Sequence, residues 1–214
     1  MRRGEPWGVP TSGPPDASGA GGDRELAALV HDNPGSRLAF EAAPECDLAR
    51  AIGLVAARPR HTEVSIDALQ LEGGAIAINM VVLGQPPDRL GRRHRARQVQ
   101  VEVDERVRFE GSATTVVIAN GEFLRGHDVV PRGHPGDGRL DVHVYALGPR
   151  ERGPMRRRLA DGTHLPHPQV LVASGRHVRV RWAGPAPVEI DGAAGPPTAS
   201  FEARLEPAAA RLLV

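Results

Sequence analysis

The stretch VVIANGEFLRGHDVVPRGHPGDGRLDV, residues 116–142, decides the fold, because it holds two predicted strands and the loop between them. The apolar run at 116–119 is typical of a strand that is buried on both faces. An Asn-Gly pair ends this strand, and a glycine-rich loop follows. After a Gly-Asp-Gly turn, apolar residues alternate from 140 to 144, which predicts a half-buried second strand.

Asp137 lies in that turn, and its chemistry allows two roles. A carboxylate and free carbonyls in a tight turn can bind a hard cation, since Mg²⁺ and Ca²⁺ take oxygen ligands. Asp-Gly is also a common turn pair, in which the Asp side chain accepts a hydrogen bond from its own backbone. The residues alone leave both roles open.

This stretch resembles the C-terminal domain of the soluble diacylglycerol kinases and the sphingosine kinase-like lipid kinases. The matching residues are Asn120, Gly121, Gly126, Pro131 and the run DGRLDV at 137–142. The resemblance implies an α+β chain, in which a truncated α/β nucleotide-binding-like segment precedes a β-rich antiparallel sandwich, as in the lipid kinases and NAD kinases. The sequence departs from the family pattern at Arg125 and His127, which replace glycines, and at Gly136, which replaces the first Asp of a pair.

The resemblance also implies a metal ion in the turn. In bacterial members of the family this turn holds a structural Mg²⁺ through one Asp side chain and backbone carbonyls. By resemblance, Asp137 is the side-chain ligand, and His134 and Arg139 are the carbonyl donors.

The amino-acid composition argues against several classes of protein. The 214 residues carry a net charge of +1, so no overall field favours a polyanionic partner. Aromatic residues make up only 3% of the chain, which leaves no stacking platform for nucleic acid. The single cysteine, Cys46, is compatible with a reducing compartment, and no apolar run reaches the roughly 18 residues of a transmembrane segment. We therefore expect a soluble, cytoplasmic protein.

The N-terminal residues contain a candidate phosphate loop. Residues 1–20 are rich in Gly, Pro and Ser without periodicity, which predicts a disordered leader. Gly21, Gly22 and Asp23 then precede a helical pattern, with Asp23 as the expected N-cap. Glycines before a helix N-terminus can bind phosphate, because exposed amides and the helix dipole favour an anion there.

The resemblance assigns nucleotide binding to these three residues, Gly21, Gly22 and Asp23, which match the start of the G-G-D-G-T motif of the lipid kinases. Arg24 and Glu25 stand where that motif has Gly and Thr. A glutamate there repels a nucleotide, and an arginine blocks the close backbone approach that glycine permits. These departures argue against ATP as a cofactor.

A second nucleotide-binding segment of the family resembles residues 40–53, but only from Asp47 onward, because its Gly-Thr loop is absent. The alternative is an amphipathic helix that packs into a core through Leu48, Ile52 and Val55. We therefore expect residues 21–60 to form a truncated α/β segment.

From residue 61 to 214 the pattern becomes β-rich and predicts an antiparallel sandwich. A hairpin is expected across Asp104 and Glu105. Further strands are expected at 63–71, 75–83, 169–173, 177–182, 188–190 and 201–205. The final strand, within 199–214, is expected to pair back toward the N-terminal segment.

Two arginine clusters are candidates for binding an anionic membrane surface. The first lies at 92–97 on a predicted loop, and the second lies at 156–158 on a predicted helix. Each charge near an anionic lipid surface contributes about 1 kcal/mol. The alternative is a solvated surface that acidic residues elsewhere balance, in keeping with the small net charge.

The last motif, Asp191-Gly192-Ala193, resembles the family's D-G-E, whose Glu is the expected general base. Phosphoryl transfer to a lipid hydroxyl requires a carboxylate near that hydroxyl to accept its proton. Here Ala193 holds the base position, so Asp191 is the only catalytic candidate in this motif. Its alternative role is that of a turn residue.

The resemblance implies ATP-dependent phosphorylation of a lipid hydroxyl as the family reaction, while each motif tied to catalysis departs from the pattern. We therefore expect a catalytically impaired family member that binds lipid or a partner protein. The alternatives are an active diacylglycerol- or sphingoid-type lipid kinase and a structural partner subunit.

Overall fold

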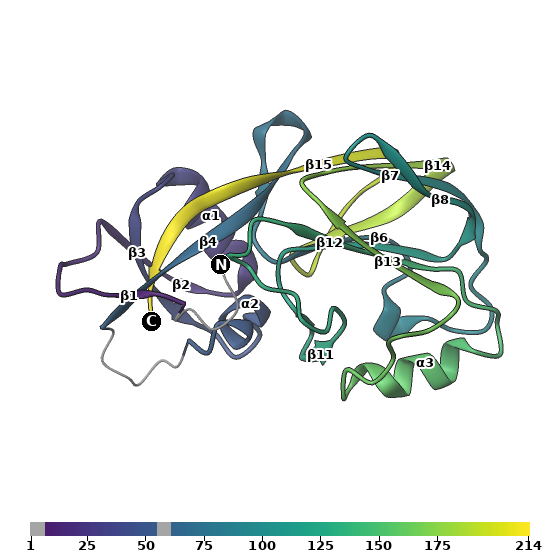
Figure 1. Ribbon diagram of the computed structural model, residues 1–214, viewed down its shortest axis with the longest axis horizontal. Helices are drawn as coiled ribbons and strands as arrows, with labels where there is room; N and C mark the ends of the chain where they lie inside the picture. The colour runs from purple at the N-terminus through teal and green to yellow at the C-terminus, as the bar shows by residue number, and fades with distance from the viewer. Residues whose placement is uncertain (1–6, 55–60) are drawn as a thin grey trace.

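The long strand β15 (Ala193–Leu213) links the two ends of the molecule in the computed structural model, which describes residues 7–54 and 61–214. Its first part pairs with β14 (His177–Ile190) and its second part with β4 (Thr62–Leu71), both antiparallel. Figure 1 shows β15 in yellow along both parts of the sheet. One strand therefore connects the N-terminal elements to the C-terminal ones.

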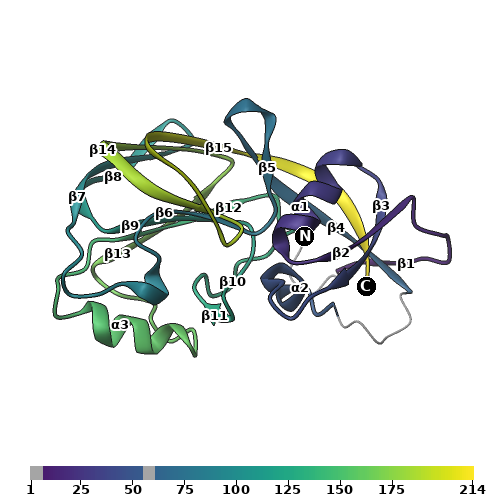
Figure 2. The same cartoon turned by 180° about the vertical axis from the view of Figure 1, so that it is seen from behind.

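The N-terminal part of the sheet packs against two helices, α1 and α2 (Figure 2). β2 pairs in parallel with β3, and β3 pairs in parallel with the end of β15. The elements are β1 (Val9–Pro10), β2 (Ala17–Gly21), α1 (Asp23–Asp32), β3 (Arg37–Ala42) and α2 (Asp47–Ala51). Their shared core contains Leu26, Leu38, Phe40, Leu48, Ile66 and Leu212. The expected helix from Asp47 onward is present, and Val55 lies outside the described residues.

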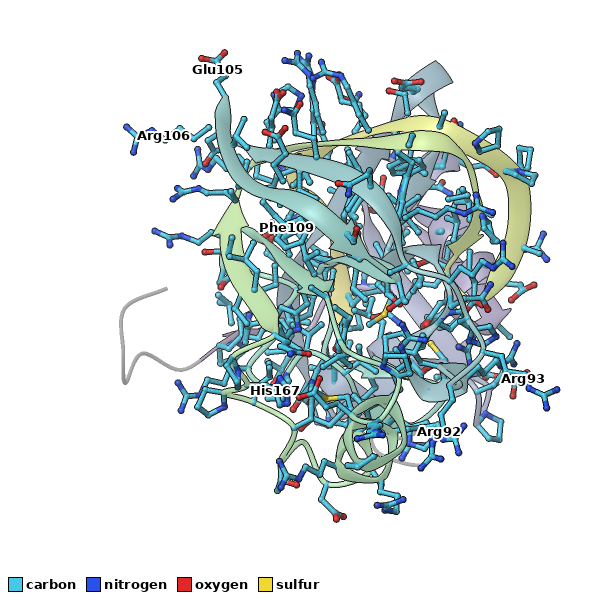
Figure 3. All side chains as sticks on the ribbon, turned by 90° about the vertical axis from the view of Figure 1, so that its right-hand side faces the viewer. Arg92, Arg93, Glu105, Arg106, Phe109 and His167 are labelled. Carbon is cyan, nitrogen blue, oxygen red and sulfur yellow. The ribbon has the colours of Figure 1, made fainter. Side chains whose placement is uncertain are left out.

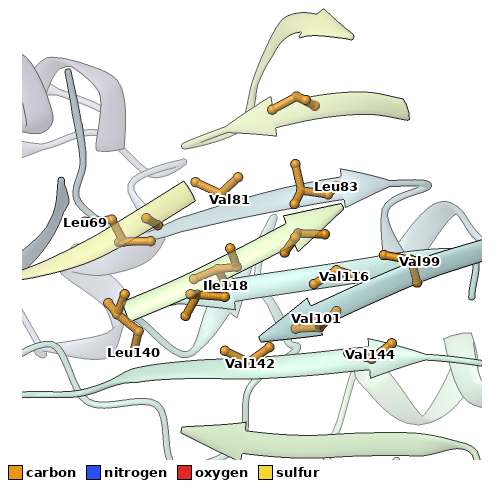
Figure 4. Close-up of a cluster of buried hydrophobic side chains, with 14 of the residues drawn as sticks. Leu69, Val81, Leu83, Val99, Val101, Val116, Ile118, Leu140, Val142 and Val144 are labelled. Carbon is orange, nitrogen blue, oxygen red and sulfur yellow. The ribbon is translucent and has the colours of Figure 1, made fainter. Parts of the chain in front are cut away.

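The C-terminal part is a β-sandwich. From β14 the sheet continues through β6, β9, β12 and β13, while β14 also pairs with β7, and β7 with β8. Its strands are β6 (Met80–Gly84), β7 (Arg97–Val103), β8 (Arg106–Ala113), β9 (Thr115–Ala119), β12 (Leu140–Tyr145) and β13 (Val170–Gly175). Figure 4 shows the core between them, where Val81, Val101, Ile118 and Val142 are fully buried. The chain is therefore α+β with an antiparallel sandwich, as predicted.

A third layer covers the outer face of β6, β9 and β12. It consists of η2 (Pro87–Arg89), β10 (Phe123–Leu124), β11 (His127–Asp128) and α3 (Arg152–Leu159). This layer buries His143 and Tyr145, which lie on the face of β12 that was expected to meet solvent. The half-buried prediction for β12 was therefore wrong, because an alternating pattern does not reveal a covering helix.

Most strand predictions are confirmed. β4 covers the expected strand at 63–71, and the β7–β8 hairpin turns at Asp104 and Glu105, whose φ angles are +49° and +63°. Such positive values suit the tight turn of a two-residue hairpin. The expected strand at 75–83 is instead split into β5 (Ile76–Ala77) and β6, after the short helix η1 (Glu72–Gly74).

Residues 7–20 correct the prediction of a disordered leader, because β1 pairs with β4 and residues 17–20 lie in β2. β2 has alternating intermediate and exposed residues, so it carries little hydrophobic signal, and its order comes from parallel pairing with β3. Residues 1–6 lie outside the described residues. No helix in the described part of the chain is long and apolar enough to span a membrane.

The two cores share strands. β4 contributes Val64 and Ile66 to the N-terminal core and Leu69 to the sandwich core. The end of β15 reaches the N-terminal part, where Leu212 pairs with Leu38 of β3. The boundary expected near residue 60 therefore falls beside a continuous sheet, and independent folding of 61–214 stays a prediction.

Candidate functional site

A cleft of roughly 550 Å³ lies where α1 begins and the β14–β15 hairpin turns. Its lining includes Asp23, Glu25, Asp47, Asn79, Arg125, Asp191 and Ala193. The structure thus brings together the candidate phosphate loop and the candidate catalytic turn, which are far apart in the sequence. We call this cavity the acidic cleft.

The N-terminus of α1 differs from the expected geometry. Gly22, and not Asp23, is the N-cap residue, and Asp23 already lies in the helix. The side chain of Glu25 folds back so that its Oε2 accepts a hydrogen bond of 2.9 Å from the Gly22 amide. Such a capping interaction satisfies an amide that otherwise has no partner inside the helix. Glu25 therefore occupies the donor that a phosphate would use.

Asp23 points inward from the start of α1 and is 7% exposed. Its Oδ1 accepts hydrogen bonds from the Leu48 amide at 2.9 Å and from the Cys46 thiol at 3.1 Å. Its Oδ2 accepts a hydrogen bond of 2.9 Å from the Asn79 amide group. Burial raises the pKa of Asp23, although the hydrogen bond from Leu48 opposes that shift. Asp23 therefore ties α1 to α2 and to the start of β6.

Asp191 occupies the two-residue turn between β14 and β15 with a positive φ of +46°. Its carboxylate accepts hydrogen bonds from the backbone amides of Ile78 at 2.8 Å, Asn79 at 3.0 Å and Met80 at 3.0 Å. Burial raises the pKa of Asp191 to about 7, against these hydrogen bonds. The same bonds explain why the strand expected at 75–83 is interrupted, because its amides turn toward Asp191.

Asn79 connects the two buried carboxylates of the cleft. Its backbone amide binds Asp191, and its side-chain amide group binds Asp23 and the carbonyl of Phe123, the latter at 3.0 Å. Gly121 lies against it, since a Cβ atom at that position would be 2.2 Å from the Asn79 Oδ1. The glycine after Asn120 is therefore required by close approach to Asn79.

Arg125, which replaces a family glycine, forms an ion-pair network at the edge of the cleft. Its Nη2 and Nε bind the two carboxylate oxygens of Asp88 at 2.7 and 2.9 Å, and its Nη1 binds Glu189. Burial opposes the charge, but the hydrogen bonds to Asp88 and Glu189 raise the pKa of Arg125 above its usual range. Each of its three side-chain nitrogens therefore donates to a carboxylate, and the pair with Asp88 has the bidentate geometry that favours strong pairs.

Asp47 fixes the backbone of the same loop. Its side chain accepts hydrogen bonds from the amides of Arg125 and Gly126, the latter at 2.8 Å. Arg125 has a positive φ of +50°, a conformation that glycine adopts without strain. The Asp47 carboxylate stabilises this conformation in the absence of the glycine that the family pattern predicts.

The turn that holds Asp137 does not line the acidic cleft. The Asp137 Oδ1 accepts a hydrogen bond of 3.0 Å from the Arg139 amide, which is the self-bonded turn that was the alternative to a metal site. The His134 carbonyl already accepts bonds from the amides of Gly136 at 2.9 Å and Asp137 at 3.3 Å. The Asp137 Oδ1 and the His134 carbonyl are thus engaged within the turn, and the described residues hold no cluster of three or more metal-binding side chains. Magnesium binding stays a prediction.

Charge in the acidic cleft is unbalanced. Its lining contains the acidic residues Asp23, Glu25, Glu45, Asp47 and Asp191 but only the arginines Arg24 and Arg125. Since Arg125 is paired within the protein, the cleft is unfavourable for a polyanion such as a nucleotide triphosphate.

The structure places Gly22, Asp23, Asp191 and Ala193, but not Gly21, in the lining of the acidic cleft. The sequence predicted a nucleotide-binding role for Gly21, Gly22 and Asp23 and a catalytic role for Asp191, and these roles stay predictions. Sequence reasoning missed the roles of Asn79, Asp47, Asp88 and Glu189. Asn79 had a signal, because it begins a spacing to Gly84 that resembles the family's N-x-x-x-x-G. The two partners of Arg125 had none, since 37 and 64 residues separate them from it in the chain.

Comparisons with known proteins agree with this architecture. The family model described as the YegS C-terminal NAD kinase beta sandwich-like domain matches residues 89–214. A solved diacylglycerol kinase structure from Bacillus anthracis str. Sterne has a TM-score of 0.74 at 17% identity, covering 92% of this chain and 76% of that one. Yeast NADH kinase complexed with NADH has a TM-score of 0.53 at 11% identity, covering 93% and 62%. At these identities the solved structures show the fold alone, and no curated protein matches.

Proposed function

Since the chain belongs to the YegS C-terminal NAD kinase beta sandwich-like family, we propose that it is a diacylglycerol kinase-like protein that transfers no phosphate and binds lipid or a partner protein. One observation carries this proposal. Two donors that line the acidic cleft, the Gly22 amide and the Arg125 guanidinium, are bound by carboxylates of the protein itself, and Arg24 is the only other basic residue in the described lining. Phosphoryl transfer depends on positioned donors at the phosphates, and here those donors are occupied.

The absence of a general base supports the same proposal. Ala193 stands at the position of the family's Glu, and an alanine side chain accepts no proton. Asp191 lines the cleft, yet its two carboxylate oxygens already accept three backbone hydrogen bonds. A general base must reach the proton that it removes, and its loss typically lowers the rate by about 10² to 10⁴.

The rival proposal is an active diacylglycerol- or sphingoid-type lipid kinase that uses Asp191 as the base. Its support is the pKa of Asp191, which burial raises to about 7, within the range that suits a general base at neutral pH. The hydrogen bonds that hold Asp191 argue against this role, because they direct the carboxylate toward residues 78–80.

Anionic lipid surfaces are the partner class that the exposed arginines favour. Arg156, Arg157 and Arg158 lie on α3 and are all exposed. Among the described residues none of these three side chains forms an ion pair. Flotation with vesicles of phosphatidylglycerol should therefore recover the protein, and changing the three arginines to Gln should reduce that recovery. Equal flotation of both proteins would contradict the assignment of this helix.

A phosphate-transfer assay with Mg-ATP and a mixture of diacylglycerol, sphingoid and phosphatidylglycerol lipids tests the proposal. The full chain is expected to show no transfer above a no-enzyme control. Ala193→Glu alone should also be inactive, because a restored base has no positioned nucleotide to act on. Transfer by the wild type that is lost in Asp191→Asn would overturn the proposal in favour of the active kinase.

A further inference from the structure

A second pocket, of roughly 350 Å³, lies at the end of β6 remote from the acidic cleft. Gly84 and Gln85, at the end of β6, contribute to its wall, whereas the acidic cleft includes Asn79, just before β6 begins. The two cavities share no residue. We propose that this second pocket, the basic pocket, binds the phosphate group of a phosphomonoester.

Two of the four basic side chains of the pocket are available for an anion, since Arg97 donates to the Pro185 carbonyl and the His94 Nδ1 accepts from the Gly91 amide. Arg93, His94, Arg95 and Arg97 contribute to the pocket lining, and none of the described residues that line it is Asp or Glu. Arg93 and Arg95 are exposed, and their side chains form no hydrogen bond or ion pair with other described residues. Figure 3 shows Arg93 extending from the edge of the molecule. This contrasts with Arg125 of the acidic cleft, whose guanidinium is already paired.

A buried arginine holds the loop that presents these side chains. Arg152 of α3 is only 3% exposed, and its Nη1 donates to the carbonyls of Gly91 at 3.2 Å, Arg92 at 3.2 Å and His94 at 2.6 Å. The loop backbone is thereby fixed before a ligand arrives. Pre-organisation of this kind reduces the entropy that binding must offset.

The opposite wall comes from the bend in β14. Arg97 donates from Nη1 to the Pro185 carbonyl at 2.6 Å, which ties this wall to the loop. Trp182 lies in the wall, is 7% exposed, and has an indole N–H without an acceptor among the described residues. Since this nitrogen is itself buried, it is not presented to a ligand in the pocket, and the Trp182 ring contributes apolar wall beside Arg93 and Arg95.

The side chains that line the basic pocket indicate which class of ligand it binds. Guanidinium groups bind phosphate through paired hydrogen bonds, and a site without carboxylates favours an anion. The volume exceeds that of a bare ion, and Trp182, Ala186 and Pro187 offer apolar surface for an organic part. A phosphomonoester, either free or as a lipid headgroup, meets both conditions. This inference is independent of catalysis in the acidic cleft.

Tryptophan fluorescence provides a direct test, because the chain has two tryptophans and Trp7→Phe leaves Trp182 as the only one. Glycerol 3-phosphate, titrated into this full-length variant, should change the Trp182 emission saturably. Adding Arg93→Gln and Arg95→Gln should weaken the affinity about tenfold or more, as expected when charge-assisted contacts are lost. The matched control, Arg156→Gln with Arg157→Gln, removes equal charge from α3 and should leave the affinity unchanged.

Vesicle flotation distinguishes the two sources of the phosphate group. If phosphatidic acid vesicles recover less of the Arg93→Gln/Arg95→Gln protein than of the wild type, while phosphatidylglycerol vesicles recover both equally, the ligand is a lipid headgroup. If glycerol 3-phosphate binds and flotation is equal in both proteins, the ligand is a soluble phosphomonoester. No saturable response to glycerol 3-phosphate, together with equal flotation, would overturn the proposal. So would a response that Arg93→Gln and Arg95→Gln leave unchanged. ATP binding or phosphate transfer in the acidic cleft would change neither the fluorescence titration nor the flotation result.

Discussion

The acidic cleft and the basic pocket lie near opposite ends of β6, and they differ in how their charged groups are paired. In the cleft, Asp23, Asp191 and Arg125 each bind at least two groups of the protein. In the pocket, Arg93 and Arg95 bind none among the described residues. These three cleft charges therefore stabilise the fold, whereas Arg93 and Arg95 of the pocket are free for a ligand.

This contrast teaches that a fold can keep the residues of a family site while their chemistry changes. Asp23 and Asp191 remain where the resemblance placed them, but both serve to hold α1, α2 and β6 together. Groups satisfied within the protein can meet a ligand only if those bonds break first, at a cost of about 1 to 3 kcal/mol for each buried group.

The largest effect is expected for Asp191→Ala. The change leaves the amides of residues 78–80 without their acceptor in a buried site, so the free energy of unfolding should fall by about 4 kcal/mol. Arg93→Gln, in the basic pocket, is the control and should change it by less than about 0.5 kcal/mol. Urea denaturation measures both. Similarly small losses of unfolding free energy in the two variants would contradict the difference between paired and free charges.

Two buried histidines that lie outside both cavities should make the stability of the protein depend on pH. Burial lowers the pKa of His143 and of His164 from 6.5 to about 4. The unfolded chain therefore binds more protons between pH 6.5 and 4, and stability falls as the pH falls through this window. The loss approaches about 3 kcal/mol for each group. His143→Gln and His164→Gln should flatten the dependence of the unfolding free energy on pH. Curves parallel to the wild type would contradict these burial effects.

A smaller effect is expected for Arg125→Gln, which leaves Glu189 without a cation among the described residues and leaves Asp88 with only the more distant Arg89, at 3.9 Å. Because the Arg125 side chain is 26% exposed, we expect a loss of about 2 kcal/mol, below that of a fully buried pair. Arg95→Gln is the matched arginine of the basic pocket and should be nearly neutral. Thermal unfolding of the two variants side by side provides the test, and an equal fall in midpoint would remove the distinction between paired and free arginines.

The smallest effect is expected for Asp137→Ala, which removes the hydrogen bond to the Arg139 amide in an exposed turn. The loss should be about 1 kcal/mol. The bonded turn requires no ion, so Mg²⁺ should shift the unfolding midpoints of wild type and variant equally. A midpoint that Mg²⁺ raises only in the wild type would make Asp137 a metal ligand.

Local patterns in the sequence predicted much of the fold. The β7–β8 hairpin followed from alternation around Asp104 and Glu105, and the buried strand β9 followed from its apolar run. The order of residues 17–20 did not follow, because β2 depends on pairing with β3, which no pattern within β2 reports. The burial of β12 likewise depends on α3, which follows it in the chain.

Sequence motifs indicated which residues belong to the candidate site, but not which groups their side chains bind. The structure places Asp23 and Asp191, the candidates from two separate motifs, within one cleft, whereas the resemblance carried no information on their hydrogen bonds. Whether Glu25 points at a ligand or caps Gly22 depends on a side-chain conformation that residue types leave undetermined. The ion pairs of Arg125 arise from tertiary contacts with distant residues, so they emerge only in the folded structure.

The hydrogen bonds and ion pairs within the acidic cleft should prevent nucleotide from binding there. Titration calorimetry with Mg-ATP tests this expectation most directly, using the full chain with Arg93→Gln and Arg95→Gln so that the basic pocket contributes no binding. We expect no measurable heat of binding up to about 1 mM nucleotide, the range of very weak complexes. Saturable binding at micromolar concentration, abolished by a charge reversal at Arg24, would contradict it.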